Sequence, residues 1–375
     1  MDDPFSFLQH LWWTGVDSVS GRQSVTRALK QDGPFSASVV IAVGKAACSM
    51  FLGAGQCLSP ATRSIVVSKY GHIDAACRAS VTGAIIESGH PVPDVNSLGA
   101  GEAIIQAVSR AGSPDRLLLL VSGGASALVE ALQPGFELTD LQSVTRTLLS
   151  SGQSIAEINE VRSGMSRIKG GRLLAEFRGD EARVYALSDV RGDSLATIGG
   201  GIGDPGHASA TVEARVVASN RVARDAAAAE AERLGFQVRL NEESLYKDVT
   251  TLAGEISRQL AGALAGVYIW GGEPTIALPP HPGMGGRNQS LALAVAGLIE
   301  GSSGISVLVA GTDGTDGPTD YAGAYVDGDT VDDAEEAEDA LRRADAGIFL
   351  GRRKCLFKSG PTNTNVMDLV IAKVT

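Results

Sequence analysis

The first candidate binding element is a glycine turn at the end of a long apolar run. Residues 117–121 read LLLLV and lead directly into Ser122, Gly123 and Gly124, with Ser126 in the helix-compatible segment beyond. Such a run predicts a buried strand of a parallel sheet that turns sharply into a helix. Glycines let backbone N–H groups approach a ligand, and a helix start suits an anion, so the turn predicts a phosphate or carboxylate site. A tight turn without a ligand is the alternative.

Basic residues stand at the other glycine-rich turns. Lys169 precedes Gly170 and Gly171, which form a second candidate backbone nest, and another Gly-Gly pair precedes Arg287. Lys45 follows a predicted strand and stands in the first turn of a predicted helix. The start of a helix favours acidic side chains, so Lys45 and Arg287 are unexpected there unless they face an anion. A solvated surface lysine is the alternative for Lys45.

Acidic residues follow two predicted strands. Asp189 comes directly after the strand predicted at 182–187, and Asp313, Asp316 and Asp320 follow the apolar strand at 305–310. Oxygen ligands of this kind suit a hard cation such as Mg²⁺, and Asp189 could also accept a hydroxyl proton. Helix capping by Asp189 and a solvated acidic turn at 313–320 are the alternatives.

The elements that must position these residues are alternating strands and helices. Strands are predicted at 37–43, 63–67, 84–87, 117–121, 182–187, 214–218, 267–270, 305–310 and 324–327. Helical patterns separate most of them, among them one at 154–168, and this alternation indicates an α/β fold with parallel sheets. The polar segment near 236–246 suggests a boundary between two domains, which a chain of 375 residues can form.

Composition excludes several classes of protein. A net charge of −11 argues against a nucleic-acid surface. The acidic N-terminus lacks a basic region followed by an apolar core, and no apolar run reaches the ~18 residues of a membrane span. The four scattered cysteines predict free thiols in a reducing compartment. A cytoplasmic protein without a nucleic-acid or membrane partner is the expectation.

Five stretches, in this order, resemble the glycerate 2-kinase family that carries a MOFRL C-terminal domain. They read GKAA at 44–47, VSGGASAL at 121–128, KGGRL at 169–173 with SDVRGD at 188–193, GGEPT with GGRNQ between 271 and 289, and AGTDGTDGPTD at 310–320 with GPTNTN at 360–365. The last two stretches together are the most specific. The resemblance covers residues from about 35 to 370, and members of this family have also been labelled hydroxypyruvate reductases.

The resemblance implies a fold and a reaction. It implies two α/β domains with mostly parallel sheets, a larger Rossmann-like domain at 1–236 and a smaller MOFRL-type domain at 247–375, with the active site in the cleft between them. Its implied reaction transfers the γ-phosphoryl of ATP to the 2-hydroxyl of D-glycerate with Mg²⁺, giving 2-phosphoglycerate. A homo-oligomer is left open.

Site residues follow from the resemblance by position. Lys45 and Arg287 match the family's important basic residues, and Asp189 matches the acid of its SDV motif. The glycine-rich turns predict the ATP contacts, which are Ser122, Gly123, Gly124, Ser126, Lys169, Gly170 and Gly171. Asp189, Asp313 and Asp316 are the predicted metal ligands.

This chain also departs from the family pattern. The differences are Arg191 and Ser194 in the SDV motif, the glycine-rich loop 199–206, Ser290, Tyr321 and Asn363. They leave a related sugar acid or hydroxy acid open as the acceptor. Two other functions stay open: an NAD(P)H-dependent hydroxypyruvate reductase, although the first strand–helix turn lacks GxGxxG, and a non-catalytic hydroxy-acid-binding protein.

Overall fold

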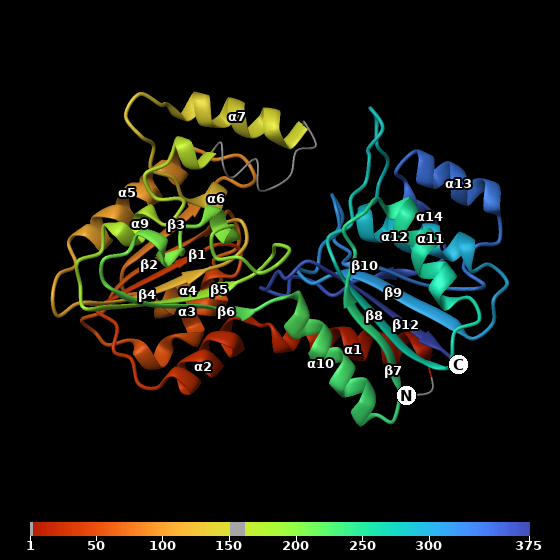
Figure 1. The fold of residues 1–375 in the computed structure, drawn as a ribbon. Coiled ribbons are helices and arrows are strands. Elements are labelled where there is room, and N and C mark those ends of the chain that lie inside the picture. Colours follow the sequence, from red (N-terminus) through yellow and green to blue (C-terminus); the bar gives the residue numbers. More distant parts are fainter. Residues whose placement is uncertain (1–2, 151–161) are drawn as a thin grey trace. The chain divides into compact units, whose positions relative to one another are not determined.

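The computed structural model describes residues 3–150 and 162–375, without the side chains of 148–150, and divides the chain into two compact units (Figure 1). Unit 1 comprises residues 1–18, 220–362 and 366–375, and unit 2 comprises 19–219 and 363–365. Most of the helix predicted at 154–168 lies outside the described residues. No described helix is both long enough and apolar enough to cross a membrane.

Unit 2 is built on a six-stranded sheet in which every pairing is parallel. The strands are β1 (Val39–Val43), β2 (Arg63–Lys69), β3 (Ala84–Ser88), β4 (Arg116–Val121), β5 (Glu181–Leu187) and β6 (Thr211–Ala218). Their spatial order is β3-β2-β1-β4-β5-β6, the order of a doubly wound dinucleotide-type sheet. The Rossmann-like prediction is therefore confirmed for this unit.

Helices cover both faces of this sheet, which explains why its central strands are apolar throughout (Figure 1). The helices are α2 (Gly21–Asp32), α3 (Ala47–Gly53), α4 (Ala75–Ser80), α5 (Val95–Ser109), α6 (Ala125–Leu128), α7 (Leu138–Ser150) and α9 (Arg172–Ala175), with the 3-10 turns η1 (Gly55–Cys57), η2 (Ile198–Gly200) and η3 (Pro205–His207). Alternate residues of β1 and β4 pack with Ile104 and Val108 of α5 in one buried core.

Unit 1 is built on a second six-stranded sheet, in the order β11-β10-β9-β12-β8-β7. The strands are β7 (Val238–Glu243), β8 (Gly266–Gly272), β9 (Ile305–Gly311), β10 (Gly323–Asp327), β11 (Leu356–Phe357) and β12 (Asp368–Val374). Only β7 and β8 pair in parallel, while β10 and β12 run opposite to their neighbours. The α/β class is confirmed, but this sheet is mixed where a mostly parallel one was predicted, because β12 inserts antiparallel between β8 and β9.

The helices of unit 1 also form two layers. They are α1 (Pro4–Ser18), α10 (Asn220–Arg233), α11 (Val249–Leu260), α12 (Arg287–Leu298), α13 (Ala334–Arg342) and α14 (Ala346–Arg352). Helices α11 and α12 share a buried core with β8, β9 and β12. Helices α1 and α10 contact each other and the sheet strands β8, β9 and β12.

The segment predicted as a domain boundary is a strand. β7 pairs in parallel with β8, and most of its residues alternate between exposed and half-buried. This pattern is typical of a strand at the edge of a sheet, and in the sequence it resembles a polar linker. Helix α10 contacts the strands of this sheet, so the chain returns to unit 1 at residue 220 instead of near 236. Helix α1, from the start of the chain, also belongs to unit 1.

Candidate active site

Predicted site residues of unit 2 gather at the carboxyl edge of its parallel sheet. Lys45 follows β1, the turn Ser122–Gly124 follows the neighbouring strand β4, and Asp189 follows β5 next to it. The strand order reverses direction between β1 and β4, which is the point where ligands bind in open α/β sheets. The topology therefore brings together three motifs that are separated by up to 144 residues in sequence.

Ser122 holds the first two turns together. Its Oγ accepts a hydrogen bond from the Ala46 N–H at 3.1 Å, and the Lys45 N–H donates to the Gly123 carbonyl at 2.9 Å. Gly44 has a φ of +126°, and a Cβ there would overlap Ser122. Ser122 is thus a positioning residue that fixes the backbone of Lys45.

Gly123 and Gly124 have no side chain because side chains from neighbouring turns occupy that space. A Cβ on Gly123 would lie closer than 3.0 Å to the Asp189 carboxylate. A Cβ on Gly124 would lie 3.1 Å from the His90 imidazole and 3.3 Å from Lys45 Cγ, and Gly124 has a φ of +83°. Asp189, His90 and Lys45 therefore surround this turn.

Replacement of Gly123 by alanine is expected to lower turnover about tenfold or more, because the new methyl group displaces the Asp189 carboxylate from the turn. The matched control is Gly99→Ala in α5, where the Cβ enters open space and alanine is the better helix former. Steady-state kinetics and thermal melting of both variants provide the measurement. Equal kinetics in the two variants would contradict a role for this turn.

The helix starts predicted to attract an anion are too short for that role. The segment after Gly124 is the single turn α6, and the segment after Gly171 is the single turn α9. A macrodipole requires several aligned peptide units, so neither turn supplies a substantial positive end. Side-chain cations must provide most of the attraction for an anion at this edge.

Lys169 is not exposed at its glycine turn, which corrects its prediction as an ATP contact. Its ammonium forms an ion pair with Glu130, and both side chains are fully buried. The aliphatic part of Lys169 lies against Gly200, close to Ser126 Oγ. Burial lowers the pKa of Lys169 to about 8, although Glu130 opposes this shift. Lys169 therefore has a structural role, because it pairs with Glu130 and packs against Gly200.

Gly170 and Gly171 are also engaged within the protein. Their N–H groups donate to the carbonyls of Gly200 and Gly201 at 3.0 and 2.8 Å. These donors are unavailable to a phosphate, so the second predicted nest is a junction between two loops. The loop 199–206 has a structural partner here, which explains its high glycine content.

His90 is the functional candidate that sequence analysis did not select. It follows β3 and contacts the space beside Gly124. Burial lowers the pKa of His90 to about 4, and the positive charges of Lys45, Lys69, Arg162 and His72 act in the same direction. His90 is therefore neutral near pH 7 and lies in positive surroundings. The available signal was its position between Gly89 and Pro91 after a strand.

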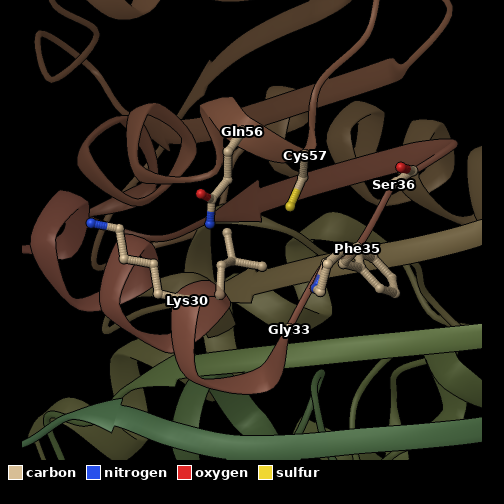
Figure 2. Close-up of a pocket in the computed structure, with 8 residues that line it drawn as sticks. Lys30, Gly33, Phe35, Ser36, Gln56 and Cys57 are labelled. Carbon is tan, nitrogen blue, oxygen red and sulfur yellow. The ribbon is translucent and has the colours of Figure 1, made fainter.

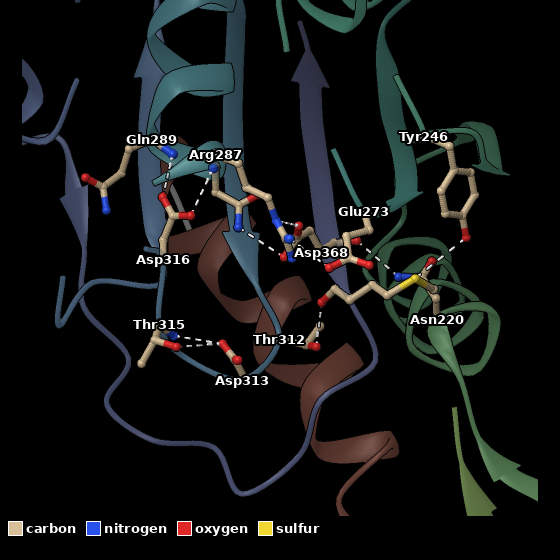
Figure 3. Close-up of polar contacts among 12 residues, drawn as sticks. Asn220, Tyr246, Glu273, Arg287, Gln289, Thr312, Asp313, Thr315, Asp316 and Asp368 are labelled. Carbon is tan, nitrogen blue, oxygen red and sulfur yellow. Dashed lines mark hydrogen bonds and ion pairs between the residues drawn. The ribbon is translucent and has the colours of Figure 1, made fainter. Parts of the chain in front are cut away.

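In unit 1, two carboxylates at the ends of the interior strands β8 and β12 hold Arg287 (Figure 3). Its Nε donates to Asp368 Oδ2 and its Nη1 to Glu273 Oε1, both at 2.7 Å. Asp368 begins β12 opposite Gly272 and Gly311, and Glu273 directly follows β8. Burial alone would lower the pKa of Arg287, but the two carboxylates outweigh it and raise the pKa. Arg287 is a fixed cation with one-third of its side chain exposed.

Asp368 was not identified from the sequence, because it lies inside an apolar closing segment. Its side chain is buried, and its second oxygen accepts a hydrogen bond from Asn288 Nδ2 at 3.0 Å. Its main-chain carbonyl accepts from Asn220 Nδ2 at 3.1 Å. Asp368 therefore aligns Arg287 with the start of α12.

Asp316 caps a helix, which corrects its prediction as a metal ligand. Its Oδ1 accepts from the Asn288 N–H at 3.0 Å and its Oδ2 from the Gln289 N–H at 2.8 Å (Figure 3). The side chain is buried, and a Cβ on Gly286 would overlap it. Burial raises the pKa of Asp316 to about 7, against the effect of the two N–H donors. Both of its oxygens accept hydrogen bonds from backbone N–H groups at the start of α12.

Asp313 remains a candidate ligand. It is half-buried, and its Oδ1 accepts from the N–H and Oγ1 of Thr315 at 3.0 and 3.1 Å. Among residues 3–150 and 162–375 no group of three or more His, Cys, Asp or Glu side chains could hold a metal ion. A magnesium site here fits only the arrangement in which one or two carboxylates and the substrate's phosphates share the ion.

Replacement of Asp316 by alanine is expected to destabilise the protein by about 1–2 kcal/mol, because α12 loses the acceptor for two N–H groups at its start. The concentration of Mg²⁺ that gives half-maximal activity should remain the same. Chemical denaturation and a magnesium titration provide the two measurements. A tenfold higher magnesium requirement with unchanged stability would restore the metal-ligand role.

A measurable cavity lies at the opposite edge of the unit 2 sheet (Figure 2). Its volume is about 350 Å³, and its lining includes Phe35 before β1 and Cys57 before β2. Arg116 and Arg183, at the starts of β4 and β5, stack over the Phe35 ring at 5.6 and 4.6 Å. Parallel α/β sheets place their sites at the carboxyl ends of the strands, so this cavity is not assigned to the candidate active site.

Comparison with known proteins defines the class. Residues 7–234 match a family model described as "Domain of unknown function (DUF4147)", and residues 266–368 match the MOFRL family. These two models correspond to the parallel-sheet site and the Arg287 site, respectively. The combination identifies a two-unit α/β protein of the DUF4147–MOFRL type.

Curated relatives specify the family further. The chain is 33% identical to D-glycerate 2-kinase of Thermotoga maritima, and the match covers 90% of each chain. It is 35% identical to glycerate 2-kinase of Pyrococcus horikoshii, over 90% of this chain and 87% of that protein. The chain belongs to the glycerate 2-kinase family of phosphotransferases. A relative from Agrobacterium vitis, 31% identical over 96% of this chain and 92% of that protein, is named putative hydroxypyruvate reductase.

Solved structures agree with the fold. The crystal structure of glycerate kinase from Thermotoga maritima matches with a TM-score of 0.86 and 31% identity, over 99% of both chains. A structure from Pyrococcus horikoshii matches with a TM-score of 0.81 and 30% identity, over 100% of this chain and 99% of that one.

Proposed function

We propose that this protein transfers the γ-phosphoryl group of ATP to the 2-hydroxyl of D-glycerate or a closely related small hydroxy acid. The family membership supports the reaction class. The observation that supports a site in unit 2 is the convergence of Lys45, His90 and Asp189 on the glycine turn at the carboxyl edge of the sheet. Phosphoryl transfer requires cations, alignment and one group that orients the hydroxyl, and these residues supply each.

In the proposed reaction, the hydroxyl oxygen of the acceptor bonds to the γ-phosphorus while the bond from that phosphorus to the β–γ bridging oxygen breaks. ADP leaves, and Asp189 accepts the hydroxyl proton. Lys45 neutralises charge on the transferred group, and Arg287 has the same role from unit 1. That residues of both units act in one site, in a cleft between two domains, stays a prediction.

Mg²⁺ fits this proposal as an ion shared between substrate phosphates and one or two carboxylates. Asp189 or Asp313 would hold it, whereas both oxygens of Asp316 accept hydrogen bonds at the start of α12. When bound, the ion would neutralise phosphate charge.

The direct test is an assay with ATP, Mg²⁺ and a panel of small hydroxy acids, with the product position determined by NMR. We expect phosphorylation of D-glycerate at the 2-hydroxyl and no activity when Mg²⁺ is removed with EDTA. Formation of 3-phosphoglycerate would contradict the proposed regiochemistry. Absence of phosphoryl transfer to every acceptor would contradict the proposed function.

The reductase alternative is not supported by the first strand–helix turn of unit 2. A dinucleotide fingerprint needs glycines at the first strand–helix turn that face the pyrophosphate. Here the open side of Gly44 is filled by Ser122. We therefore expect no NADH oxidation with hydroxypyruvate. A cytoplasmic location and the binding-protein alternative stay predictions, and phosphoryl transfer would exclude the latter.

A further inference from the structure

The carboxyl edge of the unit 2 sheet contains a buried cation without a carboxylate partner among the described residues. Arg162 is only 6% exposed. Its Nη2 donates to the Ser126 carbonyl at 2.7 Å, and its Nε has no hydrogen-bond acceptor within the described part of the chain. Buried charges are normally paired, so a buried guanidinium whose Nε has no acceptor among the described residues is suited to an anion.

The neighbouring charges do not resolve this imbalance. Glu130 attracts Arg162, but its carboxylate is already engaged by Lys169. Within the described residues, the buried cluster therefore contains two cations and one anion. One negative charge would neutralise it.

Ser126 connects this cluster to the glycine turn. Its carbonyl binds Arg162, and its buried Oγ has no partner among the described residues. Ser126 lies two residues beyond Gly124, which contacts Lys45 and His90 on its open side. The unused hydroxyl could donate to the same anion as Arg162.

The groups that act on His90 support a positive pocket here. Lys45, Lys69, Arg162 and His72 all lower the pKa of His90, after the effect of its burial. The nearby Asp94 is engaged by the N–H and hydroxyl of Ser97 and by Tyr70. Asp189 lies on the other side of the turn, against Gly123.

We propose that Arg162, Ser126 and His90 form a subsite that binds the carboxylate of the acceptor hydroxy acid. The guanidinium presents paired N–H donors that match a carboxylate. A carboxylate carries one negative charge, which balances the one excess positive charge of the Arg162 cluster. A triphosphate carries several negative charges, so we expect it to bind near the more exposed Lys45. This assignment rests on the proposed function only for the identity of the hydroxy acid.

His90 provides a reporter of binding that does not require catalysis. NMR titration of the histidine C–H resonances in the full chain, assigned with His90→Gln, measures its pKa without ATP. D-glycerate is expected to raise the pKa of His90 from about 4 to above about 5, because an anion offsets the surrounding positive charges. Glycerol, which lacks the carboxylate, should leave it unchanged. Inorganic phosphate that shifts His90 when D-glycerate does not would overturn the carboxylate assignment.

Variants of Arg162 distinguish binding from support of the fold. Arg162→Gln should abolish the glycerate-dependent shift and raise KM for the hydroxy acid about tenfold or more, with KM for ATP within about twofold. Arg162→Lys retains the charge and should restore part of this loss. Arg110→Gln, at an exposed arginine, is the control and should match the parent protein.

The two proposals fail in different ways. A lower melting temperature in Arg162→Gln with an unchanged KM, or an intact glycerate-dependent shift, would show a purely structural residue. A tenfold higher KM for ATP alone would assign the subsite to the nucleotide. A glycerate-dependent shift of His90 in a protein that transfers no phosphoryl group would support the subsite and reject the kinase activity.

Discussion

Replacement of Arg287 by alanine is expected to lower turnover by about 10²-fold or more, because a fixed cation contributes several kcal/mol to a transition state that carries phosphoryl charge. The guanidinium is oriented by Asp368 and Glu273 and is still one-third exposed, so part of it can face a ligand. Steady-state kinetics with ATP and D-glycerate measure the effect.

The same substitution should also reduce stability, and the controls separate the two effects. Loss of Arg287 leaves the buried Asp368 with Asn288 as its remaining side-chain donor, at a cost of about 1–3 kcal/mol. Arg287→Lys keeps the charge but cannot bridge both carboxylates, so we expect at least a tenfold loss of turnover with a smaller loss of stability. Arg258→Ala, at an exposed arginine of α11, should change neither. Near-normal turnover in Arg287→Ala would leave this residue only a structural role.

Replacement of Lys45 by alanine is expected to lower turnover by about 10²-fold with little change in stability. Its ammonium has no hydrogen bond or ion pair within residues 3–150 and 162–375, so no internal pair is broken. Its backbone is fixed by the Gly123 carbonyl. A lysine with a fixed backbone and no ammonium partner in the described part of the chain suits a ligand, and kinetics combined with thermal melting test this expectation.

Two further variants make the Lys45 prediction specific. Lys30→Ala removes an exposed lysine that lines the cavity at the other edge of the sheet, and it should leave turnover unchanged. The double variant with Arg287→Ala tests whether the two cations act on one reaction step. If the two cations stabilise the same transition state, the fold-loss of turnover in the double variant should be much smaller than the product of the two single losses. If they act independently, the two fold-losses should multiply. Normal kinetics in Lys45→Ala would exclude its proposed role.

Local sequence patterns predicted the strands of the parallel sheet and the glycine turns after them, because these motifs occupy a regular position in the chain. Continuous apolar strands such as β1 and β4 can be identified from composition, and the glycines that follow them mark their carboxyl ends. The polar edge strand β7 was missed, because half-exposed edge residues resemble a linker. The mixed pairing of β12 could not be predicted, since strand order arises from contacts between distant segments.

Residue roles were harder to predict than residue positions. Asp316 and Arg287 both stand in conspicuous polar motifs, but only contacts between residues far apart reveal that Asp316 caps α12 and that Arg287 is held by two carboxylates. Lys169 was predicted as an ATP contact from its glycine turn alone. Its actual partner, Glu130, lies 39 residues earlier in the chain and could not be recognised from the local sequence. Free cysteines were predicted correctly, and all four lack disulfide bonds.

The amino-acid order alone specified the strand–helix alternation, the glycine turns and the side chains that follow the strands, because these depend on neighbouring residues. Folding in three dimensions decided which charges remain available. It buried Lys169 against Glu130, used both oxygens of Asp316 at a helix start, and fixed Arg287 through Asp368, 81 residues away. The physical reason is that the energy of a charge depends on its burial and its partners, and both are set by packing between distant segments.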